Sequence, residues 1–182
     1  MKPPSWDGLR PTSDRVRETV FDILSSRIVG ARVLDVYAGT GALGIEALSR
    51  GALSITFIEQ DRRAQALIAE NLARCGVENA CVIIRSPVAR ALEALRGSRA
   101  VEPFDIVLLD PPYEPVSRHA LGPILAAAGD VIAPTGVLVL EHARRRPAPE
   151  SAGRLIRSRD VVAGDSALAF YEVRRQKEEG TQ

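Results

Sequence analysis

One short segment of the sequence places an acid, two prolines and an aromatic residue directly after an apolar run. Residues 107–113 read Val-Leu-Leu-Asp-Pro-Pro-Tyr, and we expect the run to be a buried strand that ends at Asp110. Ligands of open α/β sheets bind just beyond the carboxyl ends of such strands. Because proline lacks an N–H group and Pro112 favours an extended Pro111, the loop offers a carboxylate and bare carbonyl oxygens. These acceptors, beside the flat ring of Tyr113, suit an amino group on a planar ring.

A glycine-rich segment follows the first apolar run of the chain. It reads Asp35-Val-Tyr-Ala-Gly39-Thr-Gly41-Ala-Leu-Gly44, and the next apolar run ends at Glu59. The three glycines fit the fingerprint that holds a dinucleotide pyrophosphate at a helix N-terminus. A carboxylate at Asp35 would repel a pyrophosphate, whereas it suits the sulfonium and ammonium groups of S-adenosylmethionine. We therefore favour S-adenosylmethionine over a dinucleotide, or over a tight turn that binds nothing, with Glu59 accepting both ribose hydroxyls.

Apolar runs and amphipathic stretches alternate along most of the chain. The runs predict strands at 33–37, 54–59, 81–84, 104–109, 137–141, 155–162 and 168–173, and the stretches predict helices at 14–28, 43–50, 62–75, 88–95 and 120–128. This alternation is typical of a mostly parallel sheet with helices on both faces. The last two strands have no helix between them, so we expect an antiparallel hairpin there.

Length and composition limit the class of protein. The chain has 182 residues, of which 46% are hydrophobic, enough for the core of one domain. We expect a single domain over 1–182, with an N-terminal segment and helix at 1–30, a core at 31–175 and a polar tail at 176–182. The apolar runs are too short to span a membrane and the N-terminus lacks a signal region, so we expect a cytoplasmic protein.

The cysteines and charges add weaker constraints. Cys75 and Cys81 show no metal-binding spacing, so we expect no metal, and Cys75 continues an apolar helical stripe that predicts burial. The net charge is only +1, below that of a dedicated nucleic-acid binder. Arginines nevertheless gather near both ends of the chain, as solvated surface or as phosphate contacts. They are Arg10, Arg15, Arg17, Arg144, Arg145, Arg146, Arg154, Arg157 and Arg159.

Three segments resemble a known methyltransferase family. The Asp-Pro-Pro-Tyr loop is similar to the motif of S-adenosylmethionine-dependent enzymes that methylate exocyclic amines of nucleic acids. Residues 9–18 (Leu-Arg-Pro-Thr-Ser-Asp-Arg-Val-Arg-Glu) and 34–51 resemble the RsmD-like family, the bacterial guanine-N2 methyltransferases of 16S ribosomal RNA. The resemblance implies a Rossmann-like class I methyltransferase fold with a seven-stranded sheet, and S-adenosylhomocysteine as by-product. It also implies 16S ribosomal RNA as partner, within a small-subunit assembly particle, and a monomer that binds no membrane.

The motifs and the resemblance together assign roles to individual residues. At the catalytic site, Asp110 and loop carbonyls would accept the amine N–H groups and Tyr113 would stack on the base. Arg10, Thr12 and Arg15 would close over the cofactor or contact RNA phosphates; alternatively, Arg15 would only pair with Glu18 on its helix. Glu141 is a candidate for lining the pocket. The expected residues are Asp110, Pro111, Pro112 and Tyr113 for catalysis; Asp35, Tyr37, Ala38, Gly39, Gly41, Glu59, Gln60 and Ser86 for the cofactor; and Arg10, Thr12, Arg15 and Tyr113 for RNA.

The sequence departs from the family pattern at two places. Members usually carry a basic segment of the form Arg-Ile-Ile-x-Gly before Leu-Arg-Pro-Thr, where this sequence has Met1-Lys2-Pro3-Pro4, so we expect a smaller RNA-contacting surface. Ser86 stands where related enzymes often carry an acid that faces the adenine. Adenine recognition is therefore expected to depend more on backbone groups.

Other functions compete with methylation of guanine. The methylated amine could belong to adenine or cytosine, although a DNA methyltransferase usually needs a target-recognition region as well. Protein glutamine methyltransferases have a similar loop, but theirs begins with Asn. A non-catalytic RNA-binding assembly module would keep only a residual cofactor site. The presence of Asp35, Glu59 and Asp110 together favours an enzyme.

Overall fold

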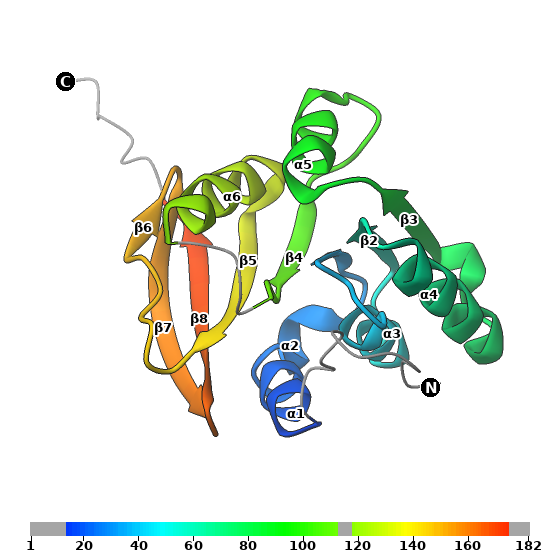
Figure 1. Cartoon of the computed structure of the whole chain (residues 1–182), viewed down its shortest axis with the longest axis horizontal. Coiled ribbons are helices and arrows are strands. Elements are labelled where there is room, and N and C mark those ends of the chain that lie inside the picture. Colours follow the sequence, from blue (N-terminus) through cyan, green and yellow to red (C-terminus); the bar gives the residue numbers. More distant parts are fainter. Residues whose placement is uncertain (1–13, 113–117, 175–182) are drawn as a thin grey trace.

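The computed structural model describes residues 14–112 and 118–174, which build one eight-stranded sheet covered by helices (Figure 1). The strand order is β3-β2-β1-β4-β5-β8-β7-β6. The parallel strands are β1 (Arg32–Val36), β2 (Ser54–Glu59), β3 (Cys81–Arg85), β4 (Phe104–Leu109) and β5 (Ile132–Ala143). The antiparallel part consists of β6 (Ser151–Ala152), β7 (Leu155–Ala163) and β8 (Ser166–Val173). The predicted mostly parallel sheet with a C-terminal antiparallel hairpin is confirmed.

The sheet has eight strands in the described residues, so the expected count of seven was wrong. The additional strand, β6, has two residues and pairs only with the start of β7. So short a strand leaves no alternation of apolar and polar residues from which to predict it. The strand predicted at 137–141 is also longer than expected, because β5 begins at Ile132 and its pairing with β4 is irregular between Phe104 and Ile106.

Helices cover both faces of the sheet, and each face buries its own apolar cluster. One cluster joins α1 (Asp14–Ile23), α2 (Ser25–Ile28), α3 (Ala42–Ser49) and α4 (Arg62–Cys75) to the sheet. The other joins α5 (Val88–Gly97) and α6 (Arg118–Val131). Among the described helices, none is long and apolar enough to cross a membrane.

The single helix predicted at 14–28 is interrupted at Leu24. This residue has φ −84° and ψ 0°, and the N–H group of Arg27 donates to its carbonyl at 2.8 Å, in an i to i+3 bond. Leu24 itself stays buried, at 1% exposure. The apolar stripe therefore continues through the break, which is why the sequence pattern did not reveal it.

Helix α4 shows how local sequence fixes an element on the sheet. Asp61 caps its N-terminus, because its carboxylate accepts from the N–H groups of Arg63 and Ala64. Gly76 ends the helix in a left-handed conformation. Cys75 is exposed, so the prediction that it lies in the core was wrong. The helix ends at Cys75, and Val77, after the turn, is the residue that packs against the cluster.

The carboxyl ends of β3, β2, β1, β4 and β5 meet at one edge of the sheet, called here the carboxyl edge. The chain runs outward from β1 to β2 and β3, and then returns to place β4 on the other side of β1. Such a reversal of strand order opens a crevice between the loops that follow the two strands, where open α/β sheets bind their ligands. The predicted acidic site residues lie at the carboxyl ends of β1, β2 and β4, so the topology brings them to this crevice.

Candidate methyl-donor and amine site

Three acidic residues meet where β1, β2 and β4 end. Asp35 lies near the end of β1, Glu59 is the last residue of β2, and Asp110 directly follows β4. The N–H group of Asp110 donates to the carbonyl of Val36 at 3.5 Å, which ties the start of the Pro-Pro loop to β1. Asp35 is 2% exposed, whereas Glu59 and Asp110 are half-buried. Carboxylates that are far apart in the sequence thus share one crevice.

Asp35 is the acid of this site whose pKa is clearly shifted by its surroundings. The pKa of its carboxyl group is raised to about 7, chiefly by burial. A hydrogen bond from the Gly44 N–H opposes this rise in the pKa, and the negative charges of Asp110 and Glu59 add to it. That bond joins the Gly44 nitrogen to Oδ2 at 3.0 Å. The charges that act on Asp35 are therefore negative, and a positively charged ligand would favour its ionised form. A sulfonium compound with an ammonium group fits this requirement.

Glu59 holds the glycine-rich loop through backbone N–H groups. Its Oε2 accepts from Gly39 at 2.9 Å, and its Oε1 accepts from Gln60 at 2.7 Å and from Asp61 at 2.8 Å. An ionised carboxylate has about four acceptor sites, so one remains on Oε2. Glu59 can therefore accept one ribose hydroxyl as it stands. A second would require one of the backbone bonds to be exchanged.

The loop between β1 and α3 takes a conformation that few residues adopt. Gly39 and Gly41 have φ of 56° and 76°, and Gly41 lies at the N-cap of α3. Tyr37 has φ 63° and is the one residue other than glycine with positive φ in the described part of the chain. A non-glycine residue in this region costs about 1–3 kcal/mol, and such strain concentrates at ligand sites. The N–H group of Gly41 donates to the carbonyl of Ala38 at 2.7 Å, so a tight turn leads into α3.

Two polar side chains of α4 hold this loop and the end of β2 through hydrogen bonds, and neither was predicted from the sequence. Asn71 is fully buried and donates from Nδ2 to the carbonyl of Thr40 at 3.2 Å. Gln65 is 7% exposed and donates from Nε2 to the carbonyl of Glu59 at 2.8 Å. Both lie on the buried face of α4, among the apolar residues of its stripe. Polar residues on such a face need partners, and that is the signal that could have identified them.

The start of the Pro-Pro loop lies beside α1 and β5. Pro111 is half-buried and Pro112 is exposed. Asp110 and Glu141 line a small hollow together with Val16 and Val20 of α1. Glu141 is 9% exposed, and its Oε1 accepts from the Ser166 hydroxyl at 2.8 Å. Glu141 thus links β5 to β8 beside Asp110.

The remaining predicted residues divide into those that the structure places at the carboxyl edge and those that it does not describe. Ser86 directly follows β3 at this edge, beside the end of β2. Arg15 is exposed on α1 and, within the described residues, forms no ion pair with Glu18. Its helix instead contains an ion pair between Arg17 and Asp14, at 2.9 Å. Arg10, Thr12 and Tyr113 lie outside the described residues.

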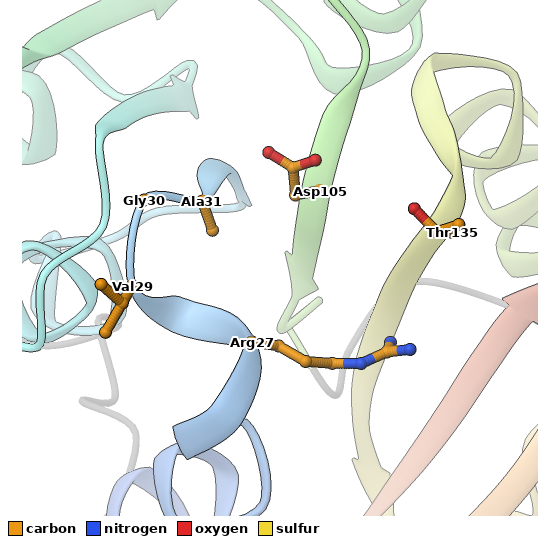
Figure 2. Close-up of a pocket in the computed structure, with 6 residues that line it drawn as sticks. All are labelled: Arg27, Val29, Gly30, Ala31, Asp105 and Thr135. Carbon is orange, nitrogen blue, oxygen red and sulfur yellow. The ribbon is translucent and has the colours of Figure 1, made fainter.

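A larger hollow lies at the opposite edge of the sheet, away from the three acids. It measures about 410 Å³ and is lined by Arg27, Val29, Gly30, Ala31, Asp105 and Thr135 (Figure 2). Asp105 lies near the start of β4, and its carboxylate accepts from the N–H group of Arg32 at 2.8 Å. This acid therefore anchors the beginning of β1. The hollow is no part of the methyl-donor site.

The fold and the crevice of acids define a Rossmann-like class I methyltransferase, a class that uses S-adenosylmethionine as methyl donor. The sequence profile of the family described as "Conserved hypothetical protein 95" matches residues 1–172, and the chain belongs to this family. The RsmD-like family predicted from the motifs is thereby confirmed, and with it the fold class and S-adenosylmethionine as cofactor.

Named relatives and a solved structure agree with this family. The chain is 37% identical over 177 residues to ribosomal RNA small subunit methyltransferase D of Escherichia coli K12, covering 96% of this chain and 85% of that protein. It is 32% identical over 174 residues to the putative rRNA methyltransferase YlbH of Bacillus subtilis, covering 96% and 93%. A solved structure of a hypothetical protein from Thermus thermophilus superimposes with a TM-score of 0.80 at 30% identity, covering 95% and 92%.

Proposed function

We propose that the protein transfers a methyl group from S-adenosylmethionine to the exocyclic N2 amine of a guanine in 16S ribosomal RNA. The observation that carries the proposal is the position of Asp110, at the end of β4, beside the buried Asp35 at the end of β1. One acid faces the donor side and the other begins the Pro-Pro loop. The relatives named as ribosomal RNA methyltransferases support RNA as the substrate class.

The donor side of the crevice consists of Asp35, Glu59 and the backbone of the glycine-rich loop. S-adenosylmethionine supplies an electrophilic methyl group on a positively charged sulfur. Asp35 would hold the ammonium group of its methionine part, and the remaining acceptor site of Glu59 would take a ribose hydroxyl. Gln60 and Ser86 follow the next two strand ends, where the adenine would lie. Ser86 can form a hydrogen bond there but carries no charge.

The amine side consists of Asp110 and the prolines that follow it. The N2 amine of guanine is a weak nucleophile because its lone pair is delocalised into the ring. Asp110 and the carbonyls of the loop would accept its two N–H bonds, which turns the lone pair toward the methyl group and stabilises the developing positive charge. Fixing the two reacting groups in line supplies much of the remaining acceleration. Tyr113 would stack on the base, a contact worth about 1–3 kcal/mol.

The target base must leave its stack to enter this crevice, which favours an exposed loop of RNA. We further propose that the protein acts as a monomer in the cytoplasm, on a small-subunit assembly particle. The same loop could accept the amine of adenine or cytosine, since both are exocyclic amines on planar rings. A non-catalytic RNA-binding module is the remaining alternative, and it predicts no turnover.

The proposal is tested by incubating the protein with S-adenosylmethionine labelled in its methyl group and small ribosomal subunits from cells that lack the modification. The RNA is then digested to nucleosides and the label is identified. We expect N2-methylguanosine at a single position. Label on adenosine or cytidine, or label only on ribosomal protein, would contradict the guanine assignment. An absence of S-adenosylmethionine binding in calorimetry would contradict the enzyme itself.

A further inference from the structure

We infer that Arg144 and Arg145, on the loop that leaves β5, hold the phosphates of the RNA strand next to the methylated base. This inference deepens the proposed function and rests on it. The two arginines come directly after the last residue of β5, at the carboxyl edge, and both side chains are exposed. Neither forms an ion pair with any residue in the described part of the chain. Their guanidinium groups therefore remain available for an anionic partner.

The order of strands determines which part of the substrate these arginines can reach. Leu140 of β5 is paired with Leu109 of β4, so Glu141 lies level with Asp110 on the neighbouring strand. Arg144 is three residues further in the same direction, on the order of 10 Å beyond Asp110 along the strand. The proposed cofactor residues follow β1, β2 and β3, on the other side of Asp110. A base at Asp110 thus has the cofactor on one side and the two arginines on the other.

The loop that carries the arginines is held at both ends by hydrogen bonds. At its start, the N–H group of Arg144 donates to the carbonyl of Asp165 at 3.1 Å, and the N–H group of Arg146 donates to Ala143 at 2.8 Å. The ring Nδ1 of His142 lies 3.0 Å from the carbonyl of Arg146. Because its neighbours there are carbonyl oxygens, this nitrogen carries the proton. The turn of the loop is thereby fixed to β5 and to the β7–β8 hairpin.

The end of the same loop is fixed by two long side chains of the hairpin. Tyr171 is fully buried and donates from its hydroxyl to the carbonyl of Pro149 at 2.7 Å. Arg157 donates from Nη1 to the carbonyl of Ala148 at 2.9 Å, and its N–H group donates to Glu150 at 2.9 Å. Ala148 is itself buried, at 6% exposure. Arg144 and Arg145 thus extend from a fixed backbone, which reduces the entropy lost when they bind phosphate.

The chain offers a matched control for the charge that these two arginines carry. Arg99 and Arg154 are also exposed, and neither forms an ion pair with a described residue. Arg99 lies between α5 and the start of β4, and Arg154 precedes the start of β7. Both are therefore at the opposite edge of the sheet. The double variants R144A/R145A and R99A/R154A change the net charge equally and differ only in where they remove it.

The test measures binding of small ribosomal subunits from cells that lack the modification, by the wild-type protein and both double variants, over a range of salt concentrations. We expect R144A/R145A to lose about tenfold in affinity at low salt and to bind with a shallower salt dependence. The slope of log K against log salt should fall by up to about 1.4, since each phosphate contact to a single strand contributes about 0.7. R99A/R154A should behave like the wild type. R144K/R145K should keep most of the slope, because it keeps the charges.

Two further measurements separate this inference from the proposed function. The affinity for S-adenosylmethionine, measured by calorimetry, should be the same in all variants, and the thermal unfolding midpoints should match. If the wild type methylates small subunits and R144A/R145A matches it in RNA affinity, salt slope and KM, the inference is overturned while the function stands. If the wild type neither binds nor methylates these subunits, the proposed function fails instead. Equal losses in both alanine variants would also overturn the inference, because total charge would then explain the effect.

Discussion

At the scale of single residues, the site depends on carboxylates held in unlike surroundings. Asp35 is buried and surrounded by negative charge, whereas Glu59 receives three backbone N–H groups. A bound cation would favour the ionised form of Asp35, whereas Glu59 holds the glycine-rich loop through its hydrogen bonds. Two carboxylates therefore have different functions in the site, because one is buried among negative charges and the other is held by backbone N–H groups.

The raised pKa of Asp35 predicts how stability and cofactor binding change with pH. The folded protein keeps a proton on Asp35 up to about pH 7, whereas the unfolded chain loses it near 3.8. Stability from this group is therefore complete below the unfolded pKa and is lost as pH rises toward 7, at up to about 1.4 kcal/mol per unit. D35N should escape this loss, because its amide oxygen can still accept from Gly44. Its melting temperature should rise relative to the wild type between pH 5 and pH 8.

Cofactor binding should show the opposite trend. A cationic ligand favours ionised Asp35, so the affinity of the wild type for S-adenosylmethionine should fall by up to about tenfold per unit below pH 7. D35N should bind more weakly at pH 8 and show no such dependence. Thermal unfolding of the protein without cofactor and calorimetry with it, at matched pH values, test both statements. A D35N protein with the pH profile of the wild type would show that another group titrates.

At the scale of elements, the close approach of α3 to the sheet depends on Gly44. A Cβ atom at this position would lie 2.3 Å from Cε1 of Phe57 and 2.9 Å from Cγ2 of Ile55, both on β2. The same residue donates its N–H group to Asp35. Helix α3 thus packs against β2 at Gly44, the residue that also donates to the buried Asp35. Gly44 therefore both allows the close packing of α3 and donates to the acid that is proposed to hold the cofactor.

The variant G44A should therefore lose both stability and cofactor affinity. Overpacking of a well-filled core costs about 1–3 kcal/mol, and displacement of α3 would move the N–H group away from Asp35. Chemical denaturation and calorimetry measure the two effects. Gly122 provides the control, since it is helical and a Cβ there would meet nothing within 4 Å. G122A should be neutral or stabilising by up to about 1 kcal/mol. Equal behaviour of the two variants would contradict the packing argument.

At the scale of the whole molecule, the strand order arranges the functional groups along one edge. Ser86, Glu59, Asp35 and Asp110 lie at the carboxyl ends of β3, β2, β1 and β4, in the spatial order of these strands. The loop that carries Arg144 and Arg145 follows β5. The residues proposed to contact the adenine, the ribose, the methionine part and the amine thus succeed one another, with the two arginines beyond them. The reversal of strand order beside β1 makes this arrangement possible.

Much of this arrangement could be predicted from the sequence because it depends on local signals. The acids that end β1, β2 and β4 follow apolar runs, and the glycines mark the turn between β1 and α3. The break at Leu24 could not be predicted, because the apolar stripe continues through it. The hydrogen bonds of Asn71 and Gln65 to the glycine-rich loop and to the end of β2 depend on contacts between distant segments. So do the hydrogen bonds of Tyr171 and Arg157 to the loop that carries Arg144 and Arg145. One sequence does not specify such pairs.

The central claim is that Asp110 acts on the amine, whereas Asp35 and Glu59 hold the methyl donor. The variant D110A separates these roles when methyl transfer to unmodified small subunits is measured in a single turnover and S-adenosylmethionine binding is measured by calorimetry. We predict that D110A abolishes transfer and leaves the dissociation constant for the donor within a few-fold of the wild type, because the donor-side acids are untouched. Equal loss of binding and transfer, or transfer at the wild-type rate, would contradict the account.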